Sequence, residues 1–168
     1  MDEQEYLEMR RRMYDKNIQT YRRQSALMEG VKRGDLDSMY EMVDDLIAGE
    51  SAYSSPATDI ILAVQRVASS DDISRQRGAV LLERIVTASK KDEVRGIELW
   101  SGAERCRAVS FALRTLIEDF NYTPNKAAEL AECFNVNVAT SGNHISMLYV
   151  QNGEYAINLK NGEMIKAA

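Results

Sequence analysis

The sequence predicts an α+β protein: a mostly helical bundle of six or seven helices, followed by a C-terminal antiparallel β-meander of three or four strands. Two observations support this fold class. As far as residue 134, apolar residues recur with helical spacing between glycine, proline and capping residues. The rest of the chain holds two Asn-Gly pairs, Asn152-Gly153 and Asn161-Gly162, each with strand-like sequence on both sides.

The two Asn-Gly pairs define the meander. Asn-Gly readily takes positive φ at both positions, which a two-residue type I′ hairpin turn requires. Strands are therefore expected at about 144–151, 154–160 and 163–167, in a register that the turns fix. The predicted cross-strand partners are Val150 with Tyr155, Leu148 with Ile157, Leu159 with Met164, and Lys160 with Glu163. Because so small a sheet is marginal by itself, its apolar side must lie on the preceding helices.

The chain begins with a long amphipathic helix. Residues 2–29 contain no Gly or Pro. Apolar residues recur every seven positions, at Leu7, Tyr14, Tyr21 and Met28. Because Ile18 alone adds an intermediate apolar position, the pattern is half of a coiled-coil seam. We divide the chain into this helix, residues 1–33, and one globular domain, residues 34–168. The helix either packs along the body or projects toward another chain.

The globular domain is expected to hold helices over 34–134 and the meander over 135–168. Gly30 and Gly34 are expected to break the first helix, and Asp35 to cap the second. Ser55-Pro56 begins a third helix that is apolar almost all round, so it should be central and buried.

Three further helices and one short helical piece follow. Asp71 or Asp72 caps a helix that runs to about residue 88, and the short piece covers residues 94–100. Ser101 starts a helix with a capping-box signature and a strong apolar stripe. Thr123-Pro124 opens the last helix, which should end near residue 134. Beyond it, Val136 and Val138 suggest one more strand before the meander.

Composition indicates a soluble cytoplasmic protein without membrane contact. The chain has 168 residues, 45% of them hydrophobic, which is enough to bury a core. Its net charge of −5 argues against generic attraction to nucleic acids or membranes. The acidic, polar start lacks the features of a secretory signal, and no apolar run approaches the length of a membrane span. Cys106 and Cys133 have no metal-ligand spacing and are expected to be reduced thiols.

The sequence contains no fingerprint of a phosphate-binding loop, nucleophile elbow, zinc site or dinucleotide site. Adjacent carboxylates occur where helix surfaces or caps are expected, which is typical of solvated side chains. Cys106 lies on the inner stripe of its helix, as a buried small hydrophobe would. We therefore expect no metal and no cofactor, and the sequence leans against an enzyme.

His144, the single histidine, is the one candidate for catalysis. It ends the turn 141–144 and could act as a general base beside Ser141 or Tyr149. The alternative is a residue at the start of a strand whose imidazole hydrogen-bonds the backbone.

A helix, a strand, a glycine turn ending in histidine, and hairpins occur in order between Thr123 and Lys160. This order resembles the small HicA-type RNA-cleaving toxins, and the resemblance implies RNA cleavage with His144 as the general base. Those toxins also carry basic surfaces and a closing helix after the sheet, whereas this chain stops at Ala168.

Two surfaces are candidates for binding. The polar side of the first helix is basic and could track a nucleic-acid backbone, or it could be neutralised by the acidic stretch of residues 34–59. Its basic residues are Arg10, Arg11, Arg12, Lys16, Arg22 and Arg23. The second side of the sheet is the other candidate, and either the first helix covers it or it meets a partner. Its residues include Ile145, Met147, Tyr149, Asn158 and Lys160.

These features predict a non-enzymatic intracellular protein that binds other proteins, as an adaptor, inhibitor or assembly factor. It would act through the N-terminal helix, the C-terminal sheet or both, with a partner protein or a second copy. The expected contact residues are Leu7, Tyr14, Tyr21, Ile145, Met147 and Tyr149. The alternative is a nucleic-acid-binding protein that uses the basic helix, with or without RNA cleavage by His144.

Overall fold

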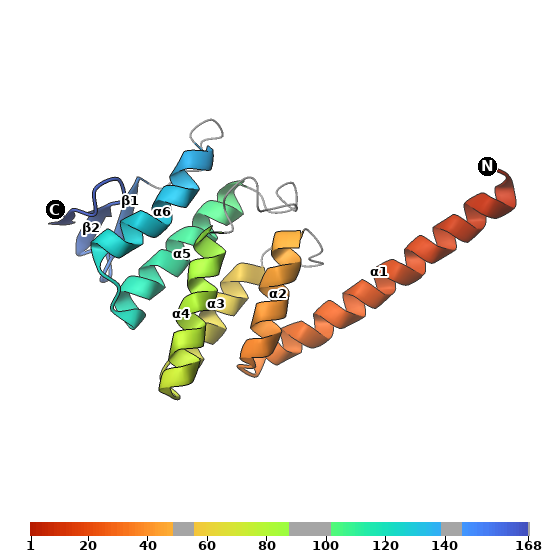
Figure 1. Ribbon diagram of the computed structural model, residues 1–168, viewed down its shortest axis with the longest axis horizontal. Coiled ribbons are helices and arrows are strands. Elements are labelled where there is room, and N and C mark those ends of the chain that lie inside the picture. Colours follow the sequence, from red (N-terminus) through yellow and green to blue (C-terminus); the bar gives the residue numbers. More distant parts are fainter. Residues whose placement is uncertain (49–55, 88–101, 139–145, 168) are drawn as a thin grey trace.

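The computed structural model describes residues 1–48, 56–87, 102–138 and 146–167 (Figure 1). The elements are α1 (Glu3–Lys32), α2 (Leu36–Ala48), α3 (Pro56–Val67), α4 (Asp72–Thr87), α5 (Gly102–Phe120), α6 (Pro124–Val138), β1 (Met147–Val150), β2 (Tyr155–Asn158) and β3 (Met164–Lys166). The α+β class is confirmed, because these helices precede one antiparallel sheet of order β1-β2-β3. The short helix expected over 94–100 lies outside the described residues.

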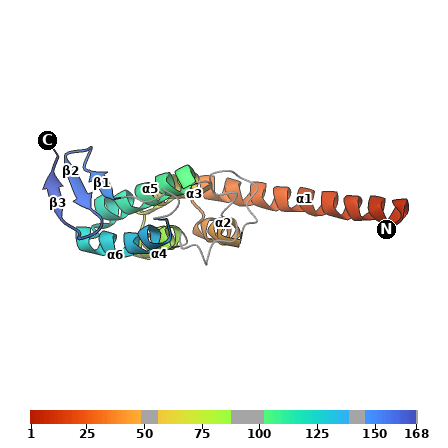
Figure 2. The ribbon, with the colours of Figure 1, turned by 90° about the horizontal axis from the view of Figure 1, so that it is seen from above.

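The helices lie in two layers, with α1, α3 and α5 in one and α2, α4 and α6 in the other (Figure 2). Successive helix pairs α1–α2, α3–α4 and α5–α6 pack side by side, which is the arrangement of α-solenoids. The sheet lies at the α5–α6 end of this stack, and α1 extends far beyond the opposite end (Figure 1).

A single core runs through the stack and into the sheet. Its largest fully buried side chains are Met39, Met42, Ile60, Ile61, Leu81, Leu82, Ile85, Leu113, Leu116 and Leu148. As expected for a central helix, α3 contacts α1, α2, α4 and α5 and buries Ile60, Ile61 and Val64, although Leu62 faces solvent. On α4, Ile73 and Val80 also face solvent, because the core side of this helix is formed by Leu81, Leu82 and Ile85.

Gly34 ends α1, and Gly30 does not break it. Gly34 has a φ of 84° and donates its N–H to the carbonyl of Val31, while Asp35 donates to the carbonyl of Gly30. These two hydrogen bonds form a Schellman motif. Gly30 lies within the helix at a point where α2 passes too close for a side chain to fit. A Cβ at this position would lie 2.1 Å from Ser38 Oγ.

The strand suggested at Val136 and Val138 is wrong. These residues continue α6, which ends at Val138 instead of near residue 134. Two valines in alternation are too weak a signal to end a helix that already has about three turns before them. The helix also replaces the strand on which the resemblance to HicA-type toxins depends.

The first hairpin has the predicted register, and the second does not. Val150 pairs with Tyr155 and Leu148 with Ile157, around a turn in which Asn152 and Gly153 both have positive φ. In the second hairpin Met164 pairs with Ile157 instead of Leu159, a shift of two residues.

The second turn is longer because a tertiary contact decides its shape. Only Gly162 has positive φ there, and Asn158 donates its N–H to the carbonyl of Glu163 across the loop of residues 159–162. Gly162 packs closely against Asn125 at the start of α6, and Leu159 is buried in the core. Lys160 and Glu163 are therefore loop residues and not a cross-strand pair.

The apolar side of the sheet lies on the helices, as predicted. Leu148, Val150, Ile157 and Leu159 are all at most 2% exposed, and β1 contacts α5. The N–H of Gln151 in the first turn donates to Glu118 of α5. Met164, expected on the same side, is 43% exposed because β3 is the edge strand and all three of its residues are exposed.

Candidate interaction surfaces

The first half of α1 stands free of the body. The side chain of Asp2 accepts a hydrogen bond from the Glu5 N–H at 2.8 Å, and the Asp2 N–H donates to the Glu5 carboxylate at 3.1 Å, a capping box that starts the helix. Residues 1–17 are all exposed, and the first buried side chain is Gln24. At 1.5 Å per residue, the exposed helical segment 3–17 is about 22 Å long. Both views show α1 projecting from the stack (Figures 1 and 2).

The projecting half has one apolar and one charged side. The predicted residues Leu7, Tyr14 and Tyr21 are 57%, 65% and 60% exposed. Tyr6 and Met13, also exposed, widen this stripe on one side, and Met9 lies beyond them, nearly opposite Leu7. Tyr6, Met9 and Met13 follow one another at intervals of three and four residues, a helical signal that the seven-residue repeat does not include. The opposite side carries charged residues and glutamines.

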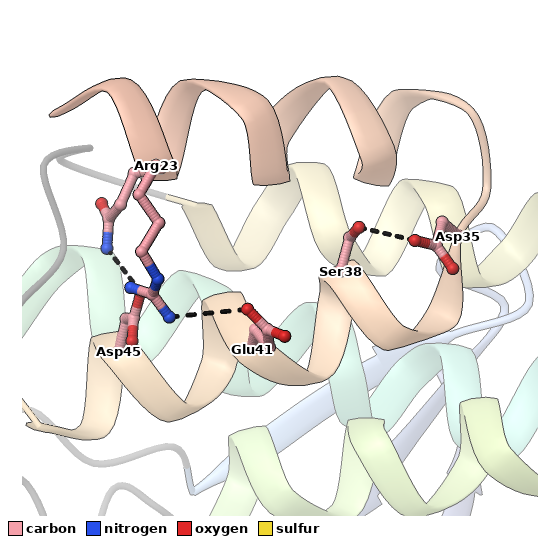
Figure 3. Close-up of polar contacts among 6 residues, drawn as sticks. Arg23, Asp35, Ser38, Glu41 and Asp45 are labelled. Atoms are coloured by element: carbon pink, nitrogen blue, oxygen red, sulfur yellow. Dashed lines mark hydrogen bonds and ion pairs between the residues drawn. The ribbon is translucent and has the colours of Figure 1, made fainter. Parts of the chain in front are cut away.

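Helix α1 is fixed to α2 by a polar cluster where it meets the body (Figure 3). Arg23 Nη1 lies 2.5 Å from Asp45 Oδ2, and Arg23 Nη2 lies 3.5 Å from Glu41 Oε2. Gln24, fully buried, donates its Nε2 to the same Asp45 oxygen at 2.9 Å. Nearer the start of α2, the Ser38 hydroxyl donates a hydrogen bond to the Asp35 carboxylate at 2.7 Å, and this bond holds the pKa of Asp35 below its ordinary value.

The four carboxylates of the acidic helix α2 are divided between its two neighbours. Asp37 and Asp44 contact Arg77 and Arg84 of α4, the second pair at 2.5 Å. Glu41 and Asp45 both pair with Arg23, the basic residue of α1 that reaches α2.

The remaining basic residues of α1 stay at the surface. Within the described part of the chain, no carboxylate lies within ion-pair distance of Arg11, Arg12, Lys16 or Arg22. Arg10 lies over the ring of Tyr6, 5.9 Å from its centroid. The predicted basic surface therefore exists on the projecting helix, next to the apolar stripe.

The outer side of the sheet carries a row of three apolar residues. Tyr149 pairs with Ala156, and Ala156 pairs with Ile165, so their side chains lie on one side of the sheet. Tyr149 is 58% exposed and Ile165 48%, while Ala156 between them is buried. Met147 is half-buried, and Ile145 lies outside the described residues. Alternation along β3 could have revealed Ile165 from the sequence.

The expectation that α1 covers this side of the sheet is wrong. Helix α1 leaves the stack at the end opposite to the sheet (Figure 1). The Schellman turn after α1 sends α2 back along the body, so the free part of α1 points away from the sheet.

A groove that the sequence did not reveal lies between α4 and the α5–α6 connection. It has a volume of about 620 Å³ and is lined by Asp72, Arg75, Gln76, Ala79, Val80, Glu83, Phe120 and Tyr122. Arg75 lies 4.9 Å from the ring centroid of Phe120, and the Tyr122 hydroxyl donates to Glu83 at 2.6 Å. Burial, with the hydrogen bond to Glu83, raises the pKa of Tyr122. Two polar groups of the groove, Tyr122 and Glu83, thus bind each other.

The residues considered for catalysis or metal binding are not brought together in the part of the chain that the structure describes. His144 and Ser141 fall in the segment 139–145, which is not described, and the side chain of Cys133 is not described either. Cys106 is half-buried, and burial raises the pKa of its thiol, which disfavours the reactive thiolate. In the described ranges, no group of three or more His, Cys, Asp or Glu side chains could hold a metal ion. No described helix is both long and apolar enough to cross a membrane.

Comparisons with known proteins give no relative: no family model matches the chain, and neither curated proteins nor solved structures give a significant match.

Proposed function

We propose that this protein is a non-enzymatic binding protein whose main docking element is the free half of α1. The observation that supports this proposal is the contrast between the ends of one helix. Met28 is 4% exposed against the body, whereas Tyr21, Tyr14 and Leu7, at the same position in the preceding heptads, are more than half exposed. The packing stripe of α1 thus continues into solvent.

Helix energetics support the same proposal. A helix shorter than about 12–15 residues is marginal in water without tertiary contacts, and most helical stability in proteins comes from packing of an apolar side. Residues 3–17 lack such packing in the single chain, although they carry two tyrosines, a leucine and a methionine on one side. Tyrosine and methionine are enriched at protein interfaces, and tyrosine is among the residues that contribute most to binding energy.

The row formed by Tyr149, Ala156 and Ile165 is a second, smaller docking surface in this proposal. It borders the exposed edge strand β3. A partner could therefore pair a strand with β3 and cover the apolar row at the same time. An adaptor or assembly factor needs two binding surfaces, whereas an inhibitor needs one surface that competes with another protein for the same partner. The two surfaces proposed here lie at opposite ends of the molecule (Figure 1).

Affinity purification from the native host tests the proposal. We expect the wild-type chain to retain a specific partner, either another protein or a second copy, and the variant L7A/Y14A/Y21A to lose it. The matched control is E8A/D15A/Q19A, which changes three residues on the charged side of the same helix and should keep the partner. An unchanged sedimentation mass together with intact partner capture in L7A/Y14A/Y21A would remove the role of α1.

A second candidate is nucleic-acid binding, favoured by the surface cations of α1 that have no ion-pair partner in the described chain. Such binding should weaken steeply with salt, because each phosphate contact releases counterions. Retention on RNA or DNA that is lost in R11E/R12E/R22E and at raised salt would support it. No retention at low salt would exclude it.

A further inference from the structure

We propose that the free half of α1 pairs in antiparallel orientation with the same segment of a second copy of this chain. This inference rests on the proposed function, in which α1 is a docking helix, and it names the partner. Three observations lead to it: the continuity of the packing stripe, the distribution of charge along the helix, and the position of the body relative to the helix.

The stripe has the geometry of a helix-pairing seam. Leu7, Tyr14, Tyr21 and Met28 share one heptad position, and Met28 is already packed against the body. Tyr6 and Met13 lie about 100° around the helix from Leu7 and Tyr14, so they widen the apolar side over the exposed region. A seam of this kind is covered by another helix that runs along it.

Charge along α1 separates into an acidic tip and a basic remainder. Residues 2–9 contain four carboxylates and no Lys or Arg, at Asp2, Glu3, Glu5 and Glu8. Residues 10–23 contain six basic residues and the single carboxylate Asp15. A parallel pair would set each block against its own copy, with like charges together throughout. An antiparallel pair sets the acidic tip of each copy beside the Arg22–Arg23 end of the other, so α1 is complementary to itself in this orientation only.

An antiparallel pair also suits the shape of the molecule. The body is attached to one end of α1, where Gln24 is the first buried residue (Figure 1). Antiparallel pairing places the two bodies at opposite ends of the helix pair, where they do not collide. Parallel pairing would bring both bodies to the same end.

Centring the two-fold axis on Tyr14 gives a specific register. Leu7 of each copy then lies beside Tyr21 of the other, and the two Tyr14 side chains meet. The acidic tip of each copy, residues 2–9, then lies along residues 19–26 of the other copy, which include Arg22 and Arg23. Neutralising part of the tip therefore has opposite effects in the two orientations, because a parallel pair sets the two acidic tips side by side.

Sedimentation across a range of concentrations, with a charge variant, tests the pairing. We expect a mass twice that of the chain. Glu3→Gln should weaken the dimer about threefold, because the substitution acts twice in a symmetric pair. Glu3 is exposed in the single chain and does not belong to the Asp2–Glu5 capping box, so folding should be unaffected and circular dichroism checks this. In a parallel pair the same substitution would remove a repulsion between the two acidic tips, so unchanged or tighter association of E3Q would overturn the antiparallel orientation.

Cysteine cross-linking tests the orientation independently. In a chain with Cys106 and Cys133 changed to alanine, an equal mixture of L7C and Y21C variants should form the mixed disulfide under mild oxidation. Formation of the L7C homodimer instead would indicate parallel pairing and overturn the inference. A monomer at concentrations up to about 100 µM would also overturn it. In that case, a host protein captured through Leu7, Tyr14 and Tyr21 would leave the proposed function standing, and its absence would remove both.

Discussion

The guanidinium of Arg23 on α1 lies 2.5 Å from the carboxylate of Asp45 on α2, a side chain that is only 9% exposed. With Gln24 bound to the same oxygen, this contact marks the point at which α1 leaves the body (Figure 3). The helix is ordered by packing on one side of this point and is surrounded by solvent on the other. The stability of the body and the interactions of the free helix should therefore respond to different substitutions.

Asp45→Ala should destabilise the protein by about 2 kcal/mol, because it removes a charged acceptor and leaves the buried Gln24 amide without this partner. The measurement is the free energy of unfolding in urea. Asp37→Ala is the matched control on the same helix, since the Asp37 side chain is 82% exposed. The control should change stability by less than about 0.5 kcal/mol. Equal effects of the two variants would contradict the structural role of Asp45.

Gly30→Ala should destabilise the protein, although alanine is the better helix former by about 1 kcal/mol. The added Cβ would lie 2.1 Å from Ser38 Oγ and 2.7 Å from Ser38 Cβ, and relief requires α1 and α2 to separate. We expect a net loss of about 1–2 kcal/mol. In a Ser38→Gly background the same substitution should become neutral or stabilising. A double-mutant cycle by urea unfolding measures this coupling, and its absence would mean that the helices do not approach as described.

Tyr122→Phe should lower stability at pH 8 by about 1 kcal/mol, because it removes the hydrogen bond to Glu83. Since the pKa of Tyr122 is raised in the folded state, the folded protein holds this proton more tightly than the unfolded chain. The stability from Tyr122 is therefore complete below the unfolded pKa of about 10 and is lost as pH rises beyond it. Urea unfolding at pH 8 and pH 11 should show the difference between wild type and Y122F shrinking. A constant difference would contradict the raised pKa.

Deletion of residues 1–17 should change the free energy of unfolding by less than about 0.5 kcal/mol, because every one of these residues is exposed. The Arg23–Asp45 contact and the packing of Met28 and Val31 remain in the shortened chain. Thermal unfolding at low protein concentration measures this without a contribution from association. A large loss of stability would place the free helix against the body in solution.

Local chemistry is what the sequence determined by itself. Capping residues, Pro56 and Pro124 set the starts of helices, and Asn152-Gly153 set the first hairpin, because these signals act within a few residues through φ and hydrogen bonds. The exposure of Leu7, Tyr14 and Tyr21 also follows from a seam that is half polar. The candidate surface on α1 could therefore be predicted from the sequence, but the position of α1 relative to the body could not.

Only the tertiary structure decided the relations between distant segments. Gly162 packs on Asn125, which lengthens the second turn and shifts β3 by two residues. Two acidic residues of α2, Asp37 and Asp44, face Arg77 and Arg84 of α4, and the other two share Arg23, which leaves most of the basic side of α1 exposed. The two-layer stack brings α4 beside Phe120 and Tyr122 to form the groove, and it sends α1 away from the sheet. These outcomes depend on contacts between residues far apart in the chain. The periodicity of the sequence shows which side of a helix is apolar, but it does not show which segment packs against that side.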